Sequence, residues 1–241
     1  MKKVTLLLLF IPLMLWWSCE EPDTTPPSIS IATAFTGTVS EIVTISVMVT
    51  DDSGIEKVEL WVDGLNTNIT DDTEPYVLLW NTASYEDSSD HVLIVRAYDD
   101  SGNEADSQPV ALTVDNTAPT AFTTGSAVTT GGTVAAGKWN STNTGLDVTV
   151  PIANDASLNT TGTVQIQGKV GSNSYASLGD AATISAINEN KTVSITAAQL
   201  EALTGFADAG VVTLTAILTD AAGNATTGTA SSTTITIDQT V

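Results

Sequence analysis

The chain has 241 residues, with 28 Asp and Glu against 7 Lys and Arg, which gives a formal net charge of -21. A surface this acidic repels phosphate groups, so the composition excludes nucleic acid as a partner. Hydrophobic residues make up 42% of the chain, which is enough apolar material to exclude disorder over its whole length.

The acidity is concentrated in the first half of the chain. Residues 19–115 hold 20 acids against two cations, Lys57 and Arg96, a balance of -18. Residues 116–241 hold 8 acids against 3 lysines, a balance of -5. Two segments with such different charge densities, in a chain of this length, predict two domains.

Residues 1–18 have the pattern of an export signal. Two lysines precede an apolar run at 4–17, which is shorter than the roughly 20 residues that span a bilayer. The pair Ser18-Cys19 resembles the end of a bacterial lipoprotein signal, and Cys19 is the only cysteine in the chain. The resemblance implies that Cys19 is lipidated and anchors the protein to the outer membrane. Ordinary signal cleavage and an uncleaved anchor are the alternatives.

Residues 19–27 combine acids with three prolines. Proline fixes the backbone and removes hydrogen-bond donors, so this segment is predicted to be an extended tether. Acids directly after the lipidated cysteine resemble the surface-displayed lipoproteins of some Gram-negative bacteria. That resemblance implies display on the outer face of the cell.

Residues 28–115 alternate between short strands and turns. Apolar and polar residues alternate over 43–50, 58–63 and 91–98, and Asp-rich turns follow at 51–54 and 99–103. With weaker strands at 29–31, 66–70, 76–80 and 110–114, this makes about seven strands in about 90 residues, which predicts an immunoglobulin-like β-sandwich.

The motifs of this segment resemble the bacterial Ig-like (Big) domains of secreted and surface proteins. The resemblance is carried by the stretches Val47–Gly54, Val58–Gly64, Pro75–Thr82 and Arg96–Asn103, in that order. It implies a fold and a surface location. Such modules serve as spacers, as adhesive repeats and as appendages of polysaccharide-active enzymes, so it implies no ligand.

The second half repeats the first loosely. Residues 116–119 form a predicted linker, and residues 120–238 form a second predicted Ig-like sandwich. Its turn at Asp220–Asn224 echoes Asp99–Asn103, and Asp238 echoes Asp115, so residues 239–241 would begin a further linker of a longer tandem array. The fold class is therefore all-β, with two consecutive sandwiches.

One segment of the second domain departs from the β pattern. Thr196 is followed three residues later by Gln199, and Gly205 follows the pair Leu200 and Leu203. A threonine cap with a glutamine at the third helical position predicts a short helical turn.

The sequence holds few residues of the kinds that carry catalysis. The only histidine is His91 and the only cysteine lies in the signal, which predicts that no Ser–His–Asp or Cys–His triad forms. Zinc would require His or Cys ligands that are missing from the mature chain. The protein is therefore predicted to be non-enzymatic and to need no cofactor.

Calcium is the one ion that the acids could bind. Asp-rich turns can supply its oxygen ligands, and the candidates are Asp51, Asp52, Asp99, Asp100 and Asp115. The alternative is that these aspartates only cap their own turns. The second domain keeps the turn at Asp220–Gly223 and loses one acid, which favours that alternative.

Two surface features could contact a partner, either a surface protein or a glycan. Trp61 lies on the outward register of its strand between Glu59 and Asp63, and is the candidate contact aromatic, although such residues often pack on the protein's own surface. Free strand edges offer a second route, the addition of a partner strand.

Together these features predict a lipid-anchored cell-envelope protein whose tandem Ig-like modules act as a stalk, spacer or adhesion module. The alternative is an accessory region of a longer polysaccharide-active enzyme or carbohydrate-binding protein.

Overall fold

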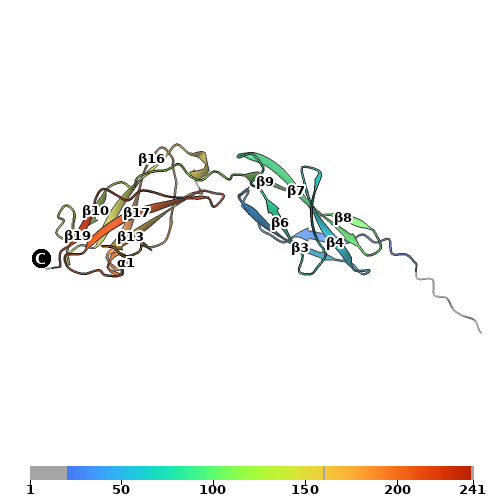
Figure 1. Ribbon diagram of the computed structural model, residues 1–241, viewed down its shortest axis with the longest axis horizontal. Coiled ribbons are helices and arrows are strands. Elements are labelled where there is room, and N and C mark those ends of the chain that lie inside the picture. The colour runs from blue at the N-terminus through green and yellow to red at the C-terminus, as the bar shows by residue number, and fades with distance from the viewer. Residues whose placement is uncertain (1–20, 160, 240–241) are drawn as a thin grey trace, which may run out of the picture.

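A computed structural model describes residues 21–159 and 161–239 (Figure 1). Two β-sandwiches lie end to end and are joined by one narrow segment, which confirms the predicted all-β fold. The predicted signal at 1–18 and Cys19 lie outside the described residues. Within the described part of the chain, no helix has the length and apolar character needed to cross a bilayer.

The first sandwich consists of two sheets, in the orders β1-β3-β6 and β2-β9-β7-β4-β5, with β8 paired to β7. Its strands are β1 (Ser28–Ile31), β2 (Thr38–Val39), β3 (Ile42–Thr50), β4 (Ile55–Val62), β5 (Leu65–Asp71), β6 (Val77–Asn81), β7 (Ser89–Asp99), β8 (Glu104–Asp106) and β9 (Val110–Val114).

The core of the first sandwich follows from the alternation in its strands. Every second residue of β3 from Val43 to Val49 is buried, and Trp80 of β6 is buried beside them at 1% exposure. Because successive side chains of a strand point to opposite faces, the period of two closes one apolar layer between the sheets. The core joins Val39, Val43, Ile45, Val47, Val49, Val58, Leu60, Val62, Tyr76, Leu78, Trp80, Leu93, Val95, Ala97, Leu112 and Val114.

The second sandwich has sheets in the orders β10-β12-β16 and β11-β19-β17-β13-β14, with β15 paired to β13 and β18 to β17. Its strands are β10 (Ala127–Thr130), β11 (Lys138–Trp139), β12 (Gly145–Ile152), β13 (Thr163–Val170), β14 (Ala176–Ser177), β15 (Ala182–Thr183), β16 (Glu189–Thr196), β17 (Val211–Thr219), β18 (Ala225–Thr227) and β19 (Ile235–Ile237), with a 3-10 turn η1 (Ala156–Leu158).

The predicted helical turn is present as α1 (Ala197–Glu201). The Thr196 hydroxyl accepts from the backbone N–H of Gln199, and the Gln199 side chain accepts from the backbone N–H of Thr196, which makes a complete capping box. Leu200 and Leu203 are both buried in the second core, so this turn closes one end of the sandwich. The helix ends at Glu201, and Gly205 lies further on with φ +82°.

Each sandwich contains one parallel pairing between a strand near its beginning and its last strand. In the first, β2 pairs with β9, and in the second, β11 pairs with β19. The other paired strands of both sandwiches run antiparallel, so these two short pairings are a shared feature of the domains.

Candidate functional site

A turn at Asp220–Asn224 fixes the segment that leads into the second domain. The Asp220 carboxylate accepts from the backbone N–H groups of Ala222 and Asn224, both at 2.9 Å, and from the Asn224 side chain at 3.0 Å. The same Asn224 Nδ2 donates to the carbonyl oxygen of Asp115 at 2.7 Å. We call this arrangement, with its counterpart at Asp99–Asn103, an Asp–Asn turn.

The first domain has the same arrangement at Asp99–Asn103. Asp99 is fully buried and accepts from the backbone N–H of Ser101 and of Asn103, and from the Asn103 side chain at 2.8 Å. Asn103 Nδ2 also donates to the carbonyl oxygen of Asp23 at 3.2 Å. The first domain therefore holds its tether as the second domain holds the linker.

The linker is also fastened to the domain that it leaves. The Asn116 side chain accepts from the backbone N–H of Glu41 at 2.9 Å and donates to the Thr82 carbonyl at 3.0 Å. Its backbone N–H donates to Asp87 at 2.6 Å. The Thr117 hydroxyl donates to the same Asp87 carboxylate. Because side chains of both domains bind the linker backbone, its conformational freedom is small.

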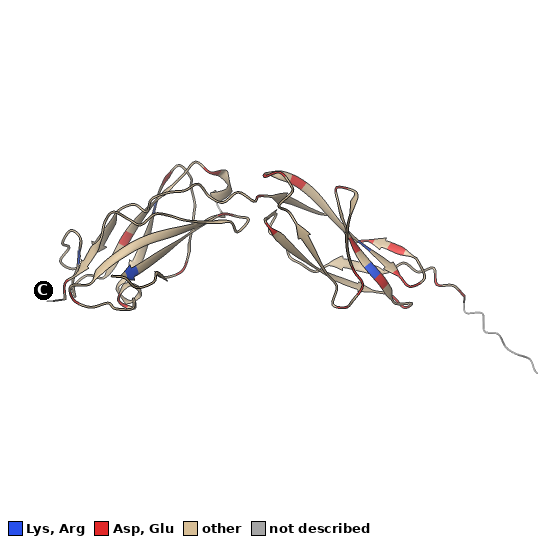
Figure 2. Ribbon diagram, viewed as in Figure 1, with Lys and Arg blue, Asp and Glu red and all other residues tan. Residues whose placement is uncertain are grey.

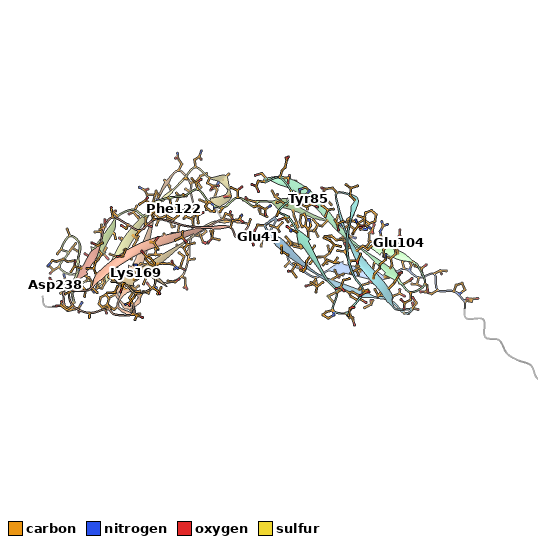
Figure 3. All side chains as sticks on the ribbon, viewed as in Figure 1. Glu41, Tyr85, Glu104, Phe122, Lys169 and Asp238 are labelled. Carbon is orange, nitrogen blue, oxygen red and sulfur yellow. The ribbon has the colours of Figure 1, made fainter. Side chains whose placement is uncertain are left out.

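The two domains also contact each other directly. The Ser40 hydroxyl donates to the carbonyl oxygen of Ala222 at 2.9 Å, which joins the end of one sandwich to the Asp–Asn turn of the next. Figure 3 shows Glu41, the neighbour of Ser40, at the end of the first sandwich that faces the second.

An acidic cavity of about 270 Å³ lies beside this joint. It is lined by Asp87, Ser88, Asp115, Thr117, Asp155, Ala156 and Ser157. Burial raises the pKa of Asp115, and the nearby charges of Asp220, Asp87 and Asp155 raise it further. The joint is thus a place where negative charge is crowded and partly shielded from water.

The predicted calcium ligands do not form one site. Asp51 and Asp52 lie at the far end of the first domain, where they meet Asp23 of the tether, and one carboxylate oxygen from each of the three lies within 4.8 Å of the others. Asp23 Oδ2 is buried and has no hydrogen-bond partner among the described residues. Carboxylate oxygens are ligands that Ca²⁺ accepts, so this trio fits a calcium ion, and calcium binding stays a prediction.

The other candidate aspartates have different surroundings. Asp99 is engaged by its own turn, and Asp100 lies in that turn with its backbone N–H 3.4 Å from the carbonyl oxygen of Gly54. Asp115 lies at the opposite end of the domain, in the joint. The sequence missed Asp23 because nothing in the tether indicates that it folds back onto the turn at 51–54.

Trp61 lies on the outer face of the larger sheet of the first domain, as predicted, but it is only partly exposed. The Arg96 guanidinium lies 4.7 Å from the centre of its ring, in a cation–π contact. Arg96 also binds Asp106 through two hydrogen bonds, at 2.7 and 3.0 Å. The hydrogen bond from Arg96 holds the pKa of Asp106 below its usual value.

Glu59, expected to point to solvent beside Trp61, is only 7% exposed. Lys57 Nζ donates to it at 2.8 Å and Asn66 Nδ2 at 3.0 Å, so its charge is compensated beneath the surface. Figure 2 shows how few cations the first domain has among its many acids, and Lys57 and Arg96 both lie on this face.

The structure places a serine and an aspartate beside the single histidine. His91 Nε2 lies 2.7 Å from the Ser89 hydroxyl, and Nδ1 lies 2.6 Å from Asp63. Ser89 and His91 are two residues apart on β7 and therefore share a face, and Asp63 follows β4 in the same sheet.

The geometry of this group differs from that of a catalytic triad in two ways. The Ser89 hydroxyl donates to the carbonyl oxygen of Glu86, whereas the hydroxyl of a catalytic serine donates to its histidine. The Asp63 side chain is 46% exposed, whereas the orienting aspartate of a triad is buried. The group instead fixes the β4–β5 turn against β7.

Comparisons with known proteins agree with this fold. Residues 27–95 match a family model described as bacterial Ig domain. The fibronectin(III)-like modules of CbhA from Clostridium thermocellum are 14% identical with a TM-score of 0.53, covering 88% of this chain and 95% of that chain. The FN1–FN3 domains of chicken CNTN1 are 15% identical with a TM-score of 0.52, covering 87% of this chain and 67% of that chain. A search of curated proteins gave no match.

These structural likenesses, at such low identity, concern the fold alone, whereas the family match concerns the sequence of the first sandwich. That match runs from the end of the tether into β7 and includes the turn at 51–54. Residues 27–95 of the first sandwich therefore match the bacterial Ig domain family.

Proposed function

We propose that the protein is a non-enzymatic cell-envelope lipoprotein whose tandem Ig modules act as a surface stalk or spacer that presents an adhesive face. The observation that carries this proposal is the joint, which is hydrogen-bonded to both of the domains that it connects. A spacer depends on such a joint, because the joint holds successive modules in a fixed relation.

The repeated turn fixes the orientation of each domain relative to the segment that enters it. Each Asp–Asn turn binds the backbone that enters its own domain, at Asp23 and at Asp115. A domain held in this way at both ends keeps a fixed orientation to its neighbour, so each module adds to the distance from the anchor. The tether at 21–27 then connects this array to the membrane.

Anchoring through Cys19 is tested by metabolic labelling with a palmitate analogue. We expect the wild-type protein to incorporate the label and Cys19→Ser to lose it. Ser18→Ala is the matched control, because it keeps a small residue before the cysteine and should keep the label. Digestion of intact cells by an added protease then tests display on the outer face, and protection of the protein until the outer membrane is opened would contradict that part of the proposal.

The absence of catalysis is tested at Ser89. Because its hydroxyl donates to a backbone carbonyl, we expect the purified protein to hydrolyse p-nitrophenyl acetate no faster than Ser89→Ala does. A rate that falls to background in Ser89→Ala and in His91→Gln would refute the non-enzymatic proposal.

A further inference from the structure

A groove of about 370 Å³ runs along one side of the first domain, between the last strands of its two sheets. On one side is β5, which ends the larger sheet, and on the other is β6, which ends the smaller sheet. The groove is lined by Val62, Asp63, Leu65, Asn66, Thr67, Ile69, Leu79, Trp80, Asn81, Ser84 and Tyr85. Figure 3 shows Tyr85 on the half of this domain that faces the joint.

The two strands that border the groove differ in the regularity of their outer edges. The pairing of β4 with β5 shifts register between Glu59 and Trp61, and Asn68 of β5 has φ +61°, so this edge is irregular. By contrast, β6 runs in unbroken register with β3 over Val77–Asn81 and has no charged side chain of its own. Of the backbone N–H groups on its free edge, only the first, that of Val77, is taken up within the described residues, by the Asp71 carboxylate at 2.7 Å. An uncharged, regular edge is a template for a further strand.

Exposed apolar side chains stand on both sides of the groove. Leu79 of β6 is 55% exposed and Leu65 of β5 is 72% exposed. They are two of the six large hydrophobic residues exposed among the described residues of this domain, and of the six only these two line the groove. They offer apolar contacts to a side chain placed between them.

A buried donor in the groove lacks an acceptor. Trp80 is 1% exposed, yet its Nε1 has no hydrogen-bond partner among the described residues. The Trp61 indole N–H, outside the groove, is likewise unpaired, so the Trp80 N–H does not by itself indicate a ligand, but as part of the groove lining it reports on what binds there.

From these observations we infer that the free edge of β6 binds an extended peptide segment of another protein, apolar at its centre and basic at its ends. The peptide backbone pairs with β6, as in strand addition, and its central side chain lies between Leu65 and Leu79. The basic ends follow from charge, since Asp63 lines the groove, Asp71 is the last residue of β5, and Glu74 lies on the chain between β5 and β6. A second copy of this acidic chain is disfavoured for the same reason.

The inference goes beyond the spacer role and does not depend on it. Its test uses the purified protein and involves neither the membrane anchor nor the cell surface. The probe is a synthetic peptide of five alternating valines and threonines with two lysines at each end. It is added to ¹⁵N-labelled protein, and the resonances of the Trp80 indole N–H and the Leu79 amide are followed. The control peptide has the same sequence with alternate backbone amides N-methylated, which keeps its charge and removes its strand pairing.

We expect the first peptide to shift both resonances in a saturable manner and the methylated peptide to leave them unchanged. Leu79→Ser removes an apolar contact on an exposed position and should weaken binding about fivefold. Val128→Ser, at a similarly exposed residue on β10 of the second domain, should leave the affinity unchanged.

Three results would overturn the inference. Equal binding of the methylated peptide would show charge attraction without strand pairing. No shift at either resonance with the first peptide at millimolar concentration would show that the edge does not accept a strand. Broadening of these resonances with protein concentration alone would assign the groove to a second copy of the chain.

Discussion

Replacing Asn224 by alanine should weaken the second domain and loosen the joint at the same time. The Asn224 side chain donates both to Asp220, which is 4% exposed, and to the backbone of Asp115. A hydrogen bond to a carboxylate contributes about 1.5–3 kcal/mol and one to a backbone carbonyl about 0.5–1.5 kcal/mol. Loss of both predicts a fall of about 2–4 kcal/mol in the free energy of unfolding of the second domain.

The loss of stability and the loosening of the joint are measured separately. Calorimetry should show the melting temperature of the second domain lowered by about 10 °C, given the usual entropy of unfolding for a domain of this size. Small-angle scattering below that temperature should show a broader distribution of distances than in the wild type, because the linker has lost its bond to the second domain.

The first domain supplies the matched control. Asn103→Ala removes the equivalent pair of bonds, to Asp99 and to the backbone of Asp23, and so should destabilise the first domain by a similar amount. Since Asp23 lies in the tether, the scattering of this variant should match that of the wild type. Equal broadening in both variants, or an unchanged second transition in Asn224→Ala, would refute the assigned role of the Asp–Asn turn.

Three further outcomes are expected. The hydrogen bond from Arg96 lowers the pKa of Asp106 in the folded state, so its stabilisation is complete above the unfolded pKa of about 4 and is lost as the pH falls through the lower folded pKa. In denaturant titrations, Asp106→Asn should therefore cost at most about 1 kcal/mol at pH 7 and progressively less as the pH is lowered. The melting temperature of the first domain should be higher in calcium than in chelator, and Asp51→Asn should abolish this difference. If the wild-type melting temperatures are equal, these aspartates bind no calcium and only cap their turns. Thr196→Ala removes the N-cap of α1 and should lower the free energy of unfolding of the second domain by about 1 kcal/mol in urea denaturation. An unchanged free energy would show that the cap does not contribute to the stability of this domain.

The fold could be predicted from the sequence because its signals are local. The alternation from Val43 to Val49 places one face of β3 in the core, and the spacing of Thr196 and Gln199 specifies a capping box. Each of these depends on residues within a few positions of one another. For that reason the longer strands of the first domain and the helix α1 lie close to where they were expected, whereas the short strands β2 and β8 were not expected.

The functional contacts could not be predicted in the same way because they join distant parts of the chain. Asn103 binds the backbone of Asp23, 80 residues away, and Asn224 binds that of Asp115, 109 residues away. The sequence shows the repeated turn but not the carbonyl group that the turn binds, since every residue has a backbone carbonyl and the residue types do not identify which one is bound. Similarly, the burial of Glu59 depends on Lys57 and Asn66 closing over it from two strands.

The parallel pairings of β2 with β9 and of β11 with β19 have a mechanical consequence. When such a molecule is pulled from its two ends, the early strand of each pair is drawn one way and the last strand the other, along their common direction. The bonds that join them, among them Thr113 N–H to Gly37 and Thr236 N–H to Gly137, are then loaded together in shear and do not open one after another. These two pairings should therefore add to the resistance of each module against a pull applied at its two ends.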